Sequence, residues 1–192
     1  MTLADRLNAC HSSVVHDVMK DLGLPIRVLP RSIVGLEPTM RAAGPVFTVR
    51  GRPDPTLDKH TSLYEWAGLL SRVPAGHVVV VQPQDDTRAL FGGLSAEALQ
   101  IKGARGYIVD GGCRDIQAVI DLGFPVFARF ATPIDIVCAW RAEAFAVPVA
   151  IGGVSFGIGY SLVYPVLSAW MAEGLPPSER AGPQALLNTA FN

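Results

Sequence analysis

The sequence predicts an α/β fold with a largely parallel central sheet. Three strand-like runs carry this prediction, at 77–82, 107–110 and 126–129. The first, HVVVVQ, is a continuous β-branched run, which is typical of a strand that is buried on both faces. Helix-like segments separate the three runs, and such an alternation indicates parallel strands that are joined by crossover helices.

Two helices are expected between these strands, one from 93 to about 102 and one that starts at 116. Gly123 and Pro125 end the second helix, because neither residue suits a helix interior. Each helix has apolar residues at helical spacing on one face: Leu94, Ala98 and Ile101 in the first, and Ile116, Val119 and Ile120 in the second.

Further elements flank this central unit. Residues 3–22 have a helical pattern in two pieces, of which Ser12 or Ser13 caps the second, and Gly23 with Pro25 ends it. The remaining expected elements are a strand at 46–49, a helix at 57–71, and strands at 147–151 and 154–156.

The composition bounds the size of the protein and its assembly. The 192 residues suffice for one domain with a real core, which we expect at 1–156, with 157–192 as a divergent tail packed on it or trailing from it. Charged residues make up 17% of the chain, against a usual share of about 25%. We therefore expect a homo-oligomer whose subunit contacts bury further apolar surface.

Several classes of partner and location are disfavoured. A net charge of −1 gives no basic field for nucleic acid. The most apolar stretch of the tail, Leu162–Met171, contains Pro165 and is shorter than the ~20 residues that cross a membrane. The first residues lack the basic start and apolar run of a signal peptide, and Cys10, Cys113 and Cys138 lack the spacing of a zinc site or a disulfide framework. We therefore expect a cytoplasmic protein.

Two glycine turns are candidate ligand sites, because each follows a predicted strand and opens a predicted helix. These turns are Gly92-Gly93 and Gly111-Gly112. In open α/β sheets, ligands bind beyond the carboxyl ends of the strands, where helix N-termini offer free N–H groups to a carboxylate. The alternative is that both are ordinary strand-to-helix turns.

The second turn leads into the adjacent pair Arg114 and Asp115. An arginine binds a carboxylate through two parallel hydrogen bonds, and an aspartate is a hard oxygen ligand for Mg²⁺ or Mn²⁺. The alternative is a surface dipeptide, in which Asp115 merely favours the helix dipole. Among the other polar residues, we expect Asp85 and Asp86 in a solvated loop and His77 in a structural role. Asp110 is expected either beside the site or in a role that stabilises the turn after its strand.

Four stretches carry a resemblance to a known protein family: PAGHVVVVQ (74–82), ALFGGLSAEALQIKGARGYIVDGGCRD (89–115), FPVFARFATPIDIVCAW (124–140) and VPVAIGGV (147–154). Together they resemble the RraA-like proteins, which include class II 4-hydroxy-4-methyl-2-oxoglutarate aldolases and oxaloacetate decarboxylases. Many members are mislabelled as demethylmenaquinone methyltransferases. The RD pair at 114–115 is the most specific element of the match.

The resemblance implies an α/β/α sandwich of the swivelling phosphohistidine-domain type, assembled as trimers or hexamers. By similarity, Arg114 and Asp115 are catalytic: Arg114 contacts a small 2-oxo acid, and Asp115 holds a divalent cation, Mg²⁺ or Mn²⁺. The backbone implied to bind the pyruvoyl carboxylate is that of Gly92, Gly93, Leu94 and Ser95. The implied reactions are retro-aldol cleavage of 4-hydroxy-4-methyl-2-oxoglutarate and decarboxylation of oxaloacetate, both through a metal-stabilised pyruvate enolate.

The chain departs from the family pattern at two places. Aldolase-type members carry an acidic residue where this chain has Gly93. They also continue after the last strand with a PGD element, and this chain has Tyr160 at the expected aspartate. These departures leave two other interpretations open, a non-catalytic regulator that binds a ribonuclease and a degenerate paralogue with neither role.

Overall fold

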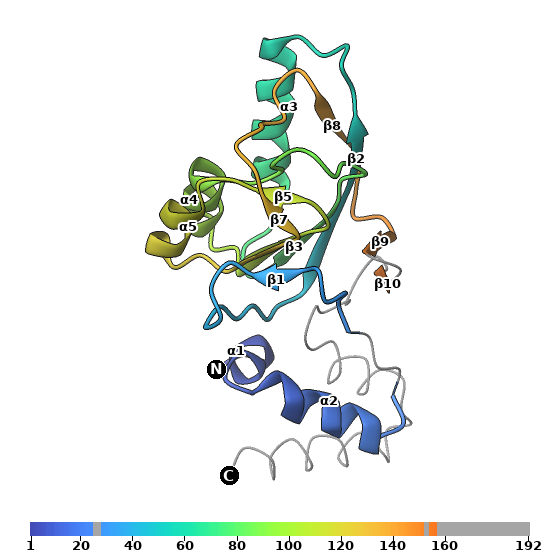
Figure 1. The fold of residues 1–192 in the computed structure, drawn as a ribbon. Coiled ribbons are helices and arrows are strands. Elements are labelled where there is room, and N and C mark those ends of the chain that lie inside the picture. The colour runs from blue at the N-terminus through green and yellow to red at the C-terminus, as the bar shows by residue number, and fades with distance from the viewer. Residues whose placement is uncertain (25–27, 152–153, 157–192) are drawn as a thin grey trace.

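A computed structural model describes residues 1–24, 28–151 and 154–156 of the chain. Its centre is a six-stranded sheet in the order β1-β6-β4-β3-β2-β8 (Figure 1). The strands are β1 (Val34–Gly35), β2 (Val46–Pro53), β3 (Val78–Gln82), β4 (Gly106–Val109), β6 (Val126–Ala128) and β8 (Trp140–Phe145). The inner pairs β2 with β3, β3 with β4 and β4 with β6 are parallel, which confirms the predicted α/β class and the largely parallel sheet.

Three helices pack on one face of this sheet (Figure 1). They are α3 (Lys59–Arg72), α4 (Gly93–Ile101) and α5 (Ile116–Leu122). Their buried side chains, such as Leu69, Leu99 and Val119, form the main core with Val79 and Val81 of β3. This core fixes the starts of α4 and α5 relative to the carboxyl ends of the parallel strands, where the two glycine turns lie.

The opposite face of the sheet has its own core. There Val78 and Val80 pack with Ile33 and with Val149 and Ile151 of β9 (Val149–Ile151). Because side chains alternate along a strand, the HVVVVQ run is buried on both sides, as its composition predicts.

The predicted elements outside the central unit are found with small shifts at their ends. Residues 3–22 form two helices, α1 (Leu3–Asn8) and α2 (Ser12–Asp21), and the last two predicted strands form an antiparallel pair, β9 with β10 (Val154–Phe156). The predicted serine cap is wrong, because α2 already begins at Ser12 and its N-cap is His11, which makes no capping hydrogen bond. The predicted tail at 157–192 lies outside the described residues.

β8 is the largest addition to the predicted fold. It pairs antiparallel with β2 and so forms one edge of the sheet. Its sequence WRAEAF alternates apolar and charged residues, but alanine, arginine and glutamate have little strand propensity, and the prediction omits it. Three two-residue strands are also absent from the prediction because they are too short to show any periodicity: β1, β5 (Gly112–Cys113) and β7 (Phe130–Ala131).

α4 turns a different face toward the core from the one that its apolar pattern suggests. Leu94 and Ile101 are 82% and 80% exposed, whereas Ser95, Ala96 and Leu99 are buried. The small side chains of Ser95 and Ala96 let the first turn pack closely. An apolar stripe of α4 is therefore left at the surface of this subunit.

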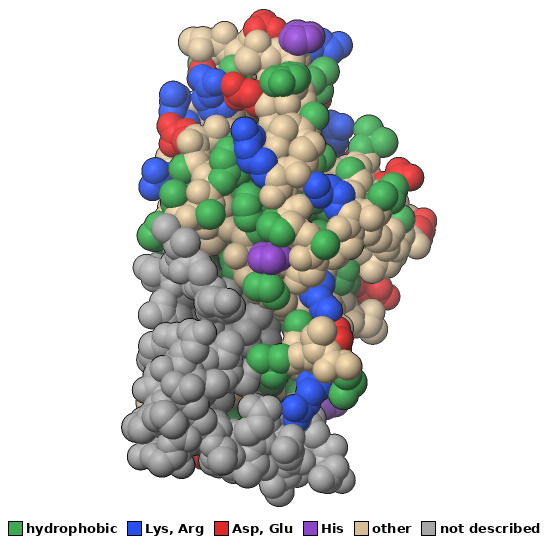
Figure 2. Space-filling view, turned by 180° about the vertical axis from the view of Figure 1, so that it is seen from behind, with side chains coloured by type: hydrophobic (Ala, Val, Ile, Leu, Met, Phe, Trp, Pro, Cys, Tyr) green, Lys and Arg blue, Asp and Glu red, His purple; other side chains and the backbone are tan. Residues whose placement is uncertain are grey.

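The described part of the face shown in Figure 2 has no large patch of only basic or only acidic side chains. Figure 2 shows basic and acidic side chains interspersed among apolar ones over the described part of that face. Among the helices that the structure describes, none is long and apolar enough to cross a membrane.

Candidate functional site

The two glycine turns lie side by side because a short parallel bridge joins the segments around them. The Leu90 N–H donates to the Gly112 carbonyl oxygen over 2.9 Å, and the Arg114 N–H donates to the Phe91 carbonyl oxygen, also over 2.9 Å. A parallel β-bridge between Ala89 and Gly112 continues this register. As a result, the start of α4 lies directly beside Arg114.

Gly92 is the point of closest approach between the two turns. A Cβ atom at this position would lie 2.7 Å from Asp115 Oδ2 and 2.9 Å from Arg114 Cγ, so the side chains of Arg114 and Asp115 would have to shift to admit it. Gly93 differs, because a Cβ atom there would meet Ala118 and Asp115 at ordinary contact distances of 3.5–3.8 Å. The observed arrangement of Arg114 and Asp115 therefore depends on glycine at 92 and has room for a side chain at 93.

Asp115 joins the two turns through its carboxylate. Its Oδ2 atom accepts a hydrogen bond of 3.1 Å from the Gly93 N–H, at the first residue of α4. Its backbone is left-handed, with φ of 54° and ψ of 38°, a conformation that non-glycine residues rarely adopt and that concentrates at functional sites. The side chain is 47% exposed, so the remaining lone pairs of the carboxylate are accessible to a ligand.

Arg114 lies between two carboxylates. Its Nε is 3.5 Å from Asp115 Oδ2, and its Nη1 is 3.4 Å from Asp135 Oδ2. Asp135 is held in turn by the Val137 N–H, which donates to its Oδ1 over 3.0 Å. Sequence reasoning assigned no role to Asp135, although it lies within the 124–140 stretch that resembles the family. Its pairing with Arg114 depends on the tertiary fold, so the sequence pattern alone does not reveal it.

An open hollow of about 370 Å³ lies beside Arg114 and Asp115. Its lining comes from the second turn and from the loop after β7: Cys113, Arg114, Asp115, Ile116, Ala131, Thr132 and Pro133. Within the described residues, no group of three or more histidine, cysteine or acidic side chains could enclose a metal ion. The donor set instead suits Mg²⁺ or Mn²⁺, since Mg²⁺ binds through one or two carboxylates and completes its shell with water and substrate oxygens.

The first turn of α4 contributes backbone donors. The helical ladder starts with the Ala96 N–H, which donates to the Gly92 carbonyl oxygen over 3.0 Å. The N–H groups of Leu94 and Ser95 precede that bond and have no acceptor within the helix. The Leu94 side chain is exposed, and the Ser95 hydroxyl accepts a hydrogen bond of 3.0 Å from Trp66 Nε1. The backbone N–H groups of these two residues are therefore available to an anion.

Two groups near the site, Cys113 and Tyr107, are buried, and burial disfavours their charged forms. Burial raises the pKa of the Cys113 thiol to about 12, so the thiolate that a nucleophile requires is scarce. Burial also raises the pKa of Tyr107, whose hydroxyl donates to the Leu90 carbonyl oxygen over 3.1 Å. Both side chains support the turn and are poor candidates for catalysis.

Other polar residues lie in structural positions. Asp85 is buried, so the prediction of a solvated loop is wrong for this residue. Burial acts to raise the pKa of Asp85, but hydrogen bonds from Thr87 and Arg88 outweigh this effect, and the pKa lies below its usual value. Asp110 pairs with Arg129 over 3.3 Å, and the His77 ring lies 3.0 Å from the Ala75 carbonyl oxygen.

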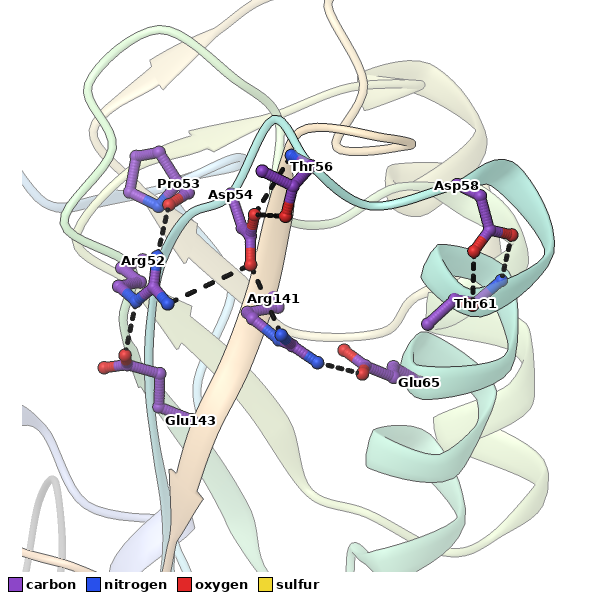
Figure 3. A network of polar contacts seen from close by, with 9 residues as sticks. All are labelled: Arg52, Pro53, Asp54, Thr56, Asp58, Thr61, Glu65, Arg141 and Glu143. Carbon is purple, nitrogen blue, oxygen red and sulfur yellow. Dashed lines mark hydrogen bonds and ion pairs between the residues drawn. The ribbon is translucent and has the colours of Figure 1, made fainter.

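A second polar cluster joins α3, β2 and β8 (Figure 3). In it, Asp54 is buried and accepts hydrogen bonds of 3.0 and 2.6 Å from the backbone and hydroxyl of Thr56. Arg141 lies 3.3 Å from Asp54 Oδ2 and also pairs with Glu65. Asp54 thus has several intramolecular donors, and the cluster ties two strands and a helix together.

Comparison with known proteins identifies the family. Residues 12–164, more than half of the chain, match the family model RraA-like, described as Aldolase/RraA. A protein of Halalkalibacterium halodurans, provisionally named as a 4-hydroxy-4-methyl-2-oxoglutarate aldolase, is 30% identical over 139 residues. That match covers 70% of this chain and 61% of the relative, so it spans less than two thirds of the relative's length.

Solved structures agree with this assignment. RraAS2 of Streptomyces coelicolor, described as an unusual member of the RNase ES inhibitor RraA protein family, is 26% identical with a TM-score of 0.69, covering 98% of this chain and 90% of that one. A structure described among novel cellulases from gut-associated microbes has a TM-score of 0.76 at 22% identity, covering 98% and 83% of the two chains, and this likeness shows the fold alone. The chain therefore belongs to the RraA-like (Aldolase/RraA) family.

Proposed function

We propose that this protein is a divalent-metal-dependent lyase that acts on a small 2-oxo acid and releases pyruvate. The observation that carries the proposal is the junction of the two turns. The half-exposed carboxylate of Asp115, the guanidinium of Arg114 and the first-turn amides of α4 lie together at the carboxyl ends of parallel strands. A metal ligand, a cation and N–H donors in one place suit a substrate with adjacent keto and carboxylate oxygens.

Each group has a distinct role in this proposal. Asp115 would hold Mg²⁺ or Mn²⁺, which when bound supplies Lewis-acid polarisation of the substrate keto group. The N–H groups of Leu94 and Ser95 would bind the substrate carboxylate, as helix N-termini bind anions. Arg114 would offset the negative charge that develops on the substrate, with Asp135 holding its guanidinium in place.

Two substrates fit the same site because their reactions share one intermediate. Retro-aldol cleavage of 4-hydroxy-4-methyl-2-oxoglutarate and β-decarboxylation of oxaloacetate both break the C3–C4 bond, one carbon away from the 2-oxo group. In both reactions C1 to C3 are left as a pyruvate enolate. The named relative from Halalkalibacterium halodurans supports the aldolase reaction. Groups that stabilise the enolate serve both reactions.

Assembly and fold type are further parts of the proposal. The exposed apolar side chains of Leu94 and Ile101 on α4 support a homo-oligomer, which we expect to be a trimer or hexamer. The largely parallel sheet supports the swivelling phosphohistidine-domain type. The described helices that pack on the sheet, α3, α4 and α5, cover one face, so the second helical layer of an α/β/α sandwich stays a prediction.

The direct test is pyruvate release from oxaloacetate by the purified protein, with Mg²⁺ and after chelation. Turnover above the rate of free Mg²⁺, lost in Asp115→Ala and kept in Asp121→Ala, is the expected result, because Asp121 lies at the far end of α5. Turnover in folded wild-type protein that does not exceed the free-metal rate would contradict decarboxylation. Pyruvate release from 4-hydroxy-4-methyl-2-oxoglutarate would then test the aldolase reaction by itself.

A second candidate is a non-catalytic regulator of a ribonuclease. The likeness to Streptomyces coelicolor RraAS2 favours it, and so does Gly93, which leaves the site without the acidic side chain of aldolase-type members. Retention of a purified ribonuclease on the immobilised protein, equally strong with and without a chelator, would support this function. Retention that disappears with the chelator would argue against it.

A further inference from the structure

The loop from Pro83 to Ser95 carries the proposed carboxylate-binding turn, and three buried or half-buried side chains donate hydrogen bonds to it. Trp140 Nε1 donates to the Pro83 carbonyl oxygen over 2.8 Å, at the start of the loop. The Tyr107 hydroxyl donates to Leu90 in the middle of the loop. Trp66 Nε1 donates to Ser95 Oγ at its end. The loop is therefore fixed at both ends by tryptophans that do not line the hollow.

These two tryptophans pack against each other. The ring centroids of Trp66, on α3, and Trp140, on β8, are 6.1 Å apart, with an angle of 74° between the planes. This edge-to-face geometry is the favoured one for aromatic pairs. One aromatic contact thus links the start of the loop to its end.

The polar cluster of Figure 3 joins the same two elements, α3 and β8. The residues next to the tryptophans, Glu65 and Arg141, pair with each other, and Arg141 also contacts Asp54. The Ser62 hydroxyl accepts a hydrogen bond of 3.2 Å from the Cys138 N–H, again between α3 and the chain that enters β8. We call these four side chains, Glu65, Trp66, Trp140 and Arg141, the α3–β8 seam.

The bond to Ser95 connects this seam to the amides that face the substrate. Ser95 is in the first turn of α4 and is only 9% exposed, so its hydroxyl has little access to water if Trp66 is removed. A buried hydroxyl that loses its hydrogen-bond partner raises the free energy of the folded state. A shift of the first turn of α4 that gives the hydroxyl another partner would lower this cost. The amides of Leu94 and Ser95 belong to that turn.

We propose that Trp66 is a positioning residue, which holds the first turn of α4 in its anion-binding geometry through the hydroxyl of Ser95. The proposal rests on the function proposed above only in identifying the anion as the carboxylate of a 2-oxo acid. Trp66 acts through Ser95 and does not touch the substrate.

Binding of oxalate in the presence of Mg²⁺ measures the consequence for the ligand. Oxalate has the adjacent oxygens of a pyruvate enolate but does not react. Trp66→Phe keeps an aromatic ring and removes the donor, so we expect its oxalate dissociation constant to rise by about two- to tenfold. Ser95→Ala should give a similar rise. Tyr64→Phe is the matched control, because Tyr64 is on the same helix and its side chain is exposed, and its affinity should equal that of the wild type.

Hydrogen exchange measures the position of the turn without any ligand. In the full-length protein, we expect the peptide over residues 89–99 to exchange faster in Trp66→Phe and in Ser95→Ala, and at the wild-type rate in Tyr64→Phe. The double variant Trp66→Phe/Ser95→Ala should exchange no faster than either single variant, since both remove one bond.

The outcomes separate this proposal from the proposed function. Wild-type protein that binds no oxalate contradicts the lyase function, while faster exchange in both single variants still supports the positioning role. Wild-type binding together with unchanged exchange and affinity in Trp66→Phe overturns the positioning role and leaves the lyase function standing. Effects of the two substitutions that add in the double variant also overturn it.

Discussion

Two aspartates in this molecule pair with arginine and differ in their surroundings. Asp54 is paired with Arg141 and Arg52, and its side chain is 7% exposed, with two further hydrogen bonds from Thr56. Asp115 is paired with Arg114 over 3.5 Å, and its side chain is 47% exposed, with one hydrogen bond from the Gly93 N–H. The first carboxylate is occupied by its own protein, whereas the second keeps lone pairs for a ligand. Exposure and remaining bonding capacity, more than pairing, distinguish the structural Asp54 from Asp115, the proposed ligand-binding aspartate.

Asp115→Ala tests this distinction with the largest expected effect. We expect metal-dependent pyruvate release to fall by about two to three orders of magnitude, because the substitution removes the proposed metal ligand. The melting temperature should fall modestly, because alanine fits the left-handed backbone of residue 115 less well than aspartate does, while the half-exposed carboxylate itself has few partners. Asp54→Asn provides the matched comparison, with activity per folded molecule close to the wild type. If the two variants lose activity equally, exposure does not separate the two aspartates.

Gly92→Ala has the next largest effect. A Cβ atom 2.7 Å from Asp115 Oδ2 must displace the Arg114–Asp115 pair, and a misplacement of about 1 Å can cost about 100-fold in rate. Gly93→Ala is the control, because a Cβ atom there meets only ordinary contacts, and we expect its activity to stay near the wild type. Equal losses in both variants would show that the turn needs flexible glycines for some other reason than close approach.

Asp135→Asn tests whether Asp135 holds the guanidinium of Arg114 in place. The pair is half exposed, so we expect a modest fall in kcat/KM for oxaloacetate, of about two- to fivefold. The fall should lie mainly in KM if Arg114 binds substrate and transition state equally. An unchanged kcat/KM would show that Arg114 holds its position without Asp135.

The smallest effect is expected in the pH dependence of stability. The pKa of Asp54 lies below its usual value of 3.8, because of two hydrogen bonds from Thr56 and the charges of Arg52 and Arg141, against the opposing effect of burial. A lowered folded-state pKa gives stability that is present above the unfolded pKa and is lost as the pH falls through the folded pKa. The melting temperature of Asp54→Asn should therefore fall less than that of the wild type between about pH 5 and about pH 3. If the melting temperatures of Asp54→Asn and the wild type fall equally over that pH range, Asp54 does not contribute to the pH dependence of stability.

The elements that the sequence predicts are those with a strong local pattern. The β-branched run of β3 and the glycine turns before α4 and α5 depend on neighbouring residues alone, and the structure contains all of them. The sequence does not predict β8, because its alanine and charged residues have little strand propensity and form a strand through pairing with β2. Ser95, which is buried in place of Leu94, accepts a hydrogen bond from Trp66, 29 positions away, and a contact over that distance leaves no local pattern.

In the candidate site too, the sequence predicts what neighbouring residues determine and misses contacts between residues that are distant in the chain. Arg114 and Asp115 are adjacent in the chain, so sequence alone brings them together, and the family resemblance supplies their proposed roles. The contact of Asp135 with Arg114 joins residues 21 positions apart and depends on the loop after β7. The burial of Asp85 arises from hydrogen bonds to Thr87 and Arg88, a local turn that sequence reasoning could have recognised.

Calorimetric titration with Mn²⁺, with and without oxalate, tests the central claim most directly. The claim is that Asp115 and the first turn of α4 form one site for a metal and a 2-oxo acid. We expect the wild type to bind Mn²⁺ more tightly in the presence of oxalate, Asp54→Asn to behave like the wild type, and Asp115→Ala to lose Mn²⁺ binding under both conditions. Binding of Mn²⁺ and oxalate by Asp115→Ala with wild-type affinity would contradict the claim.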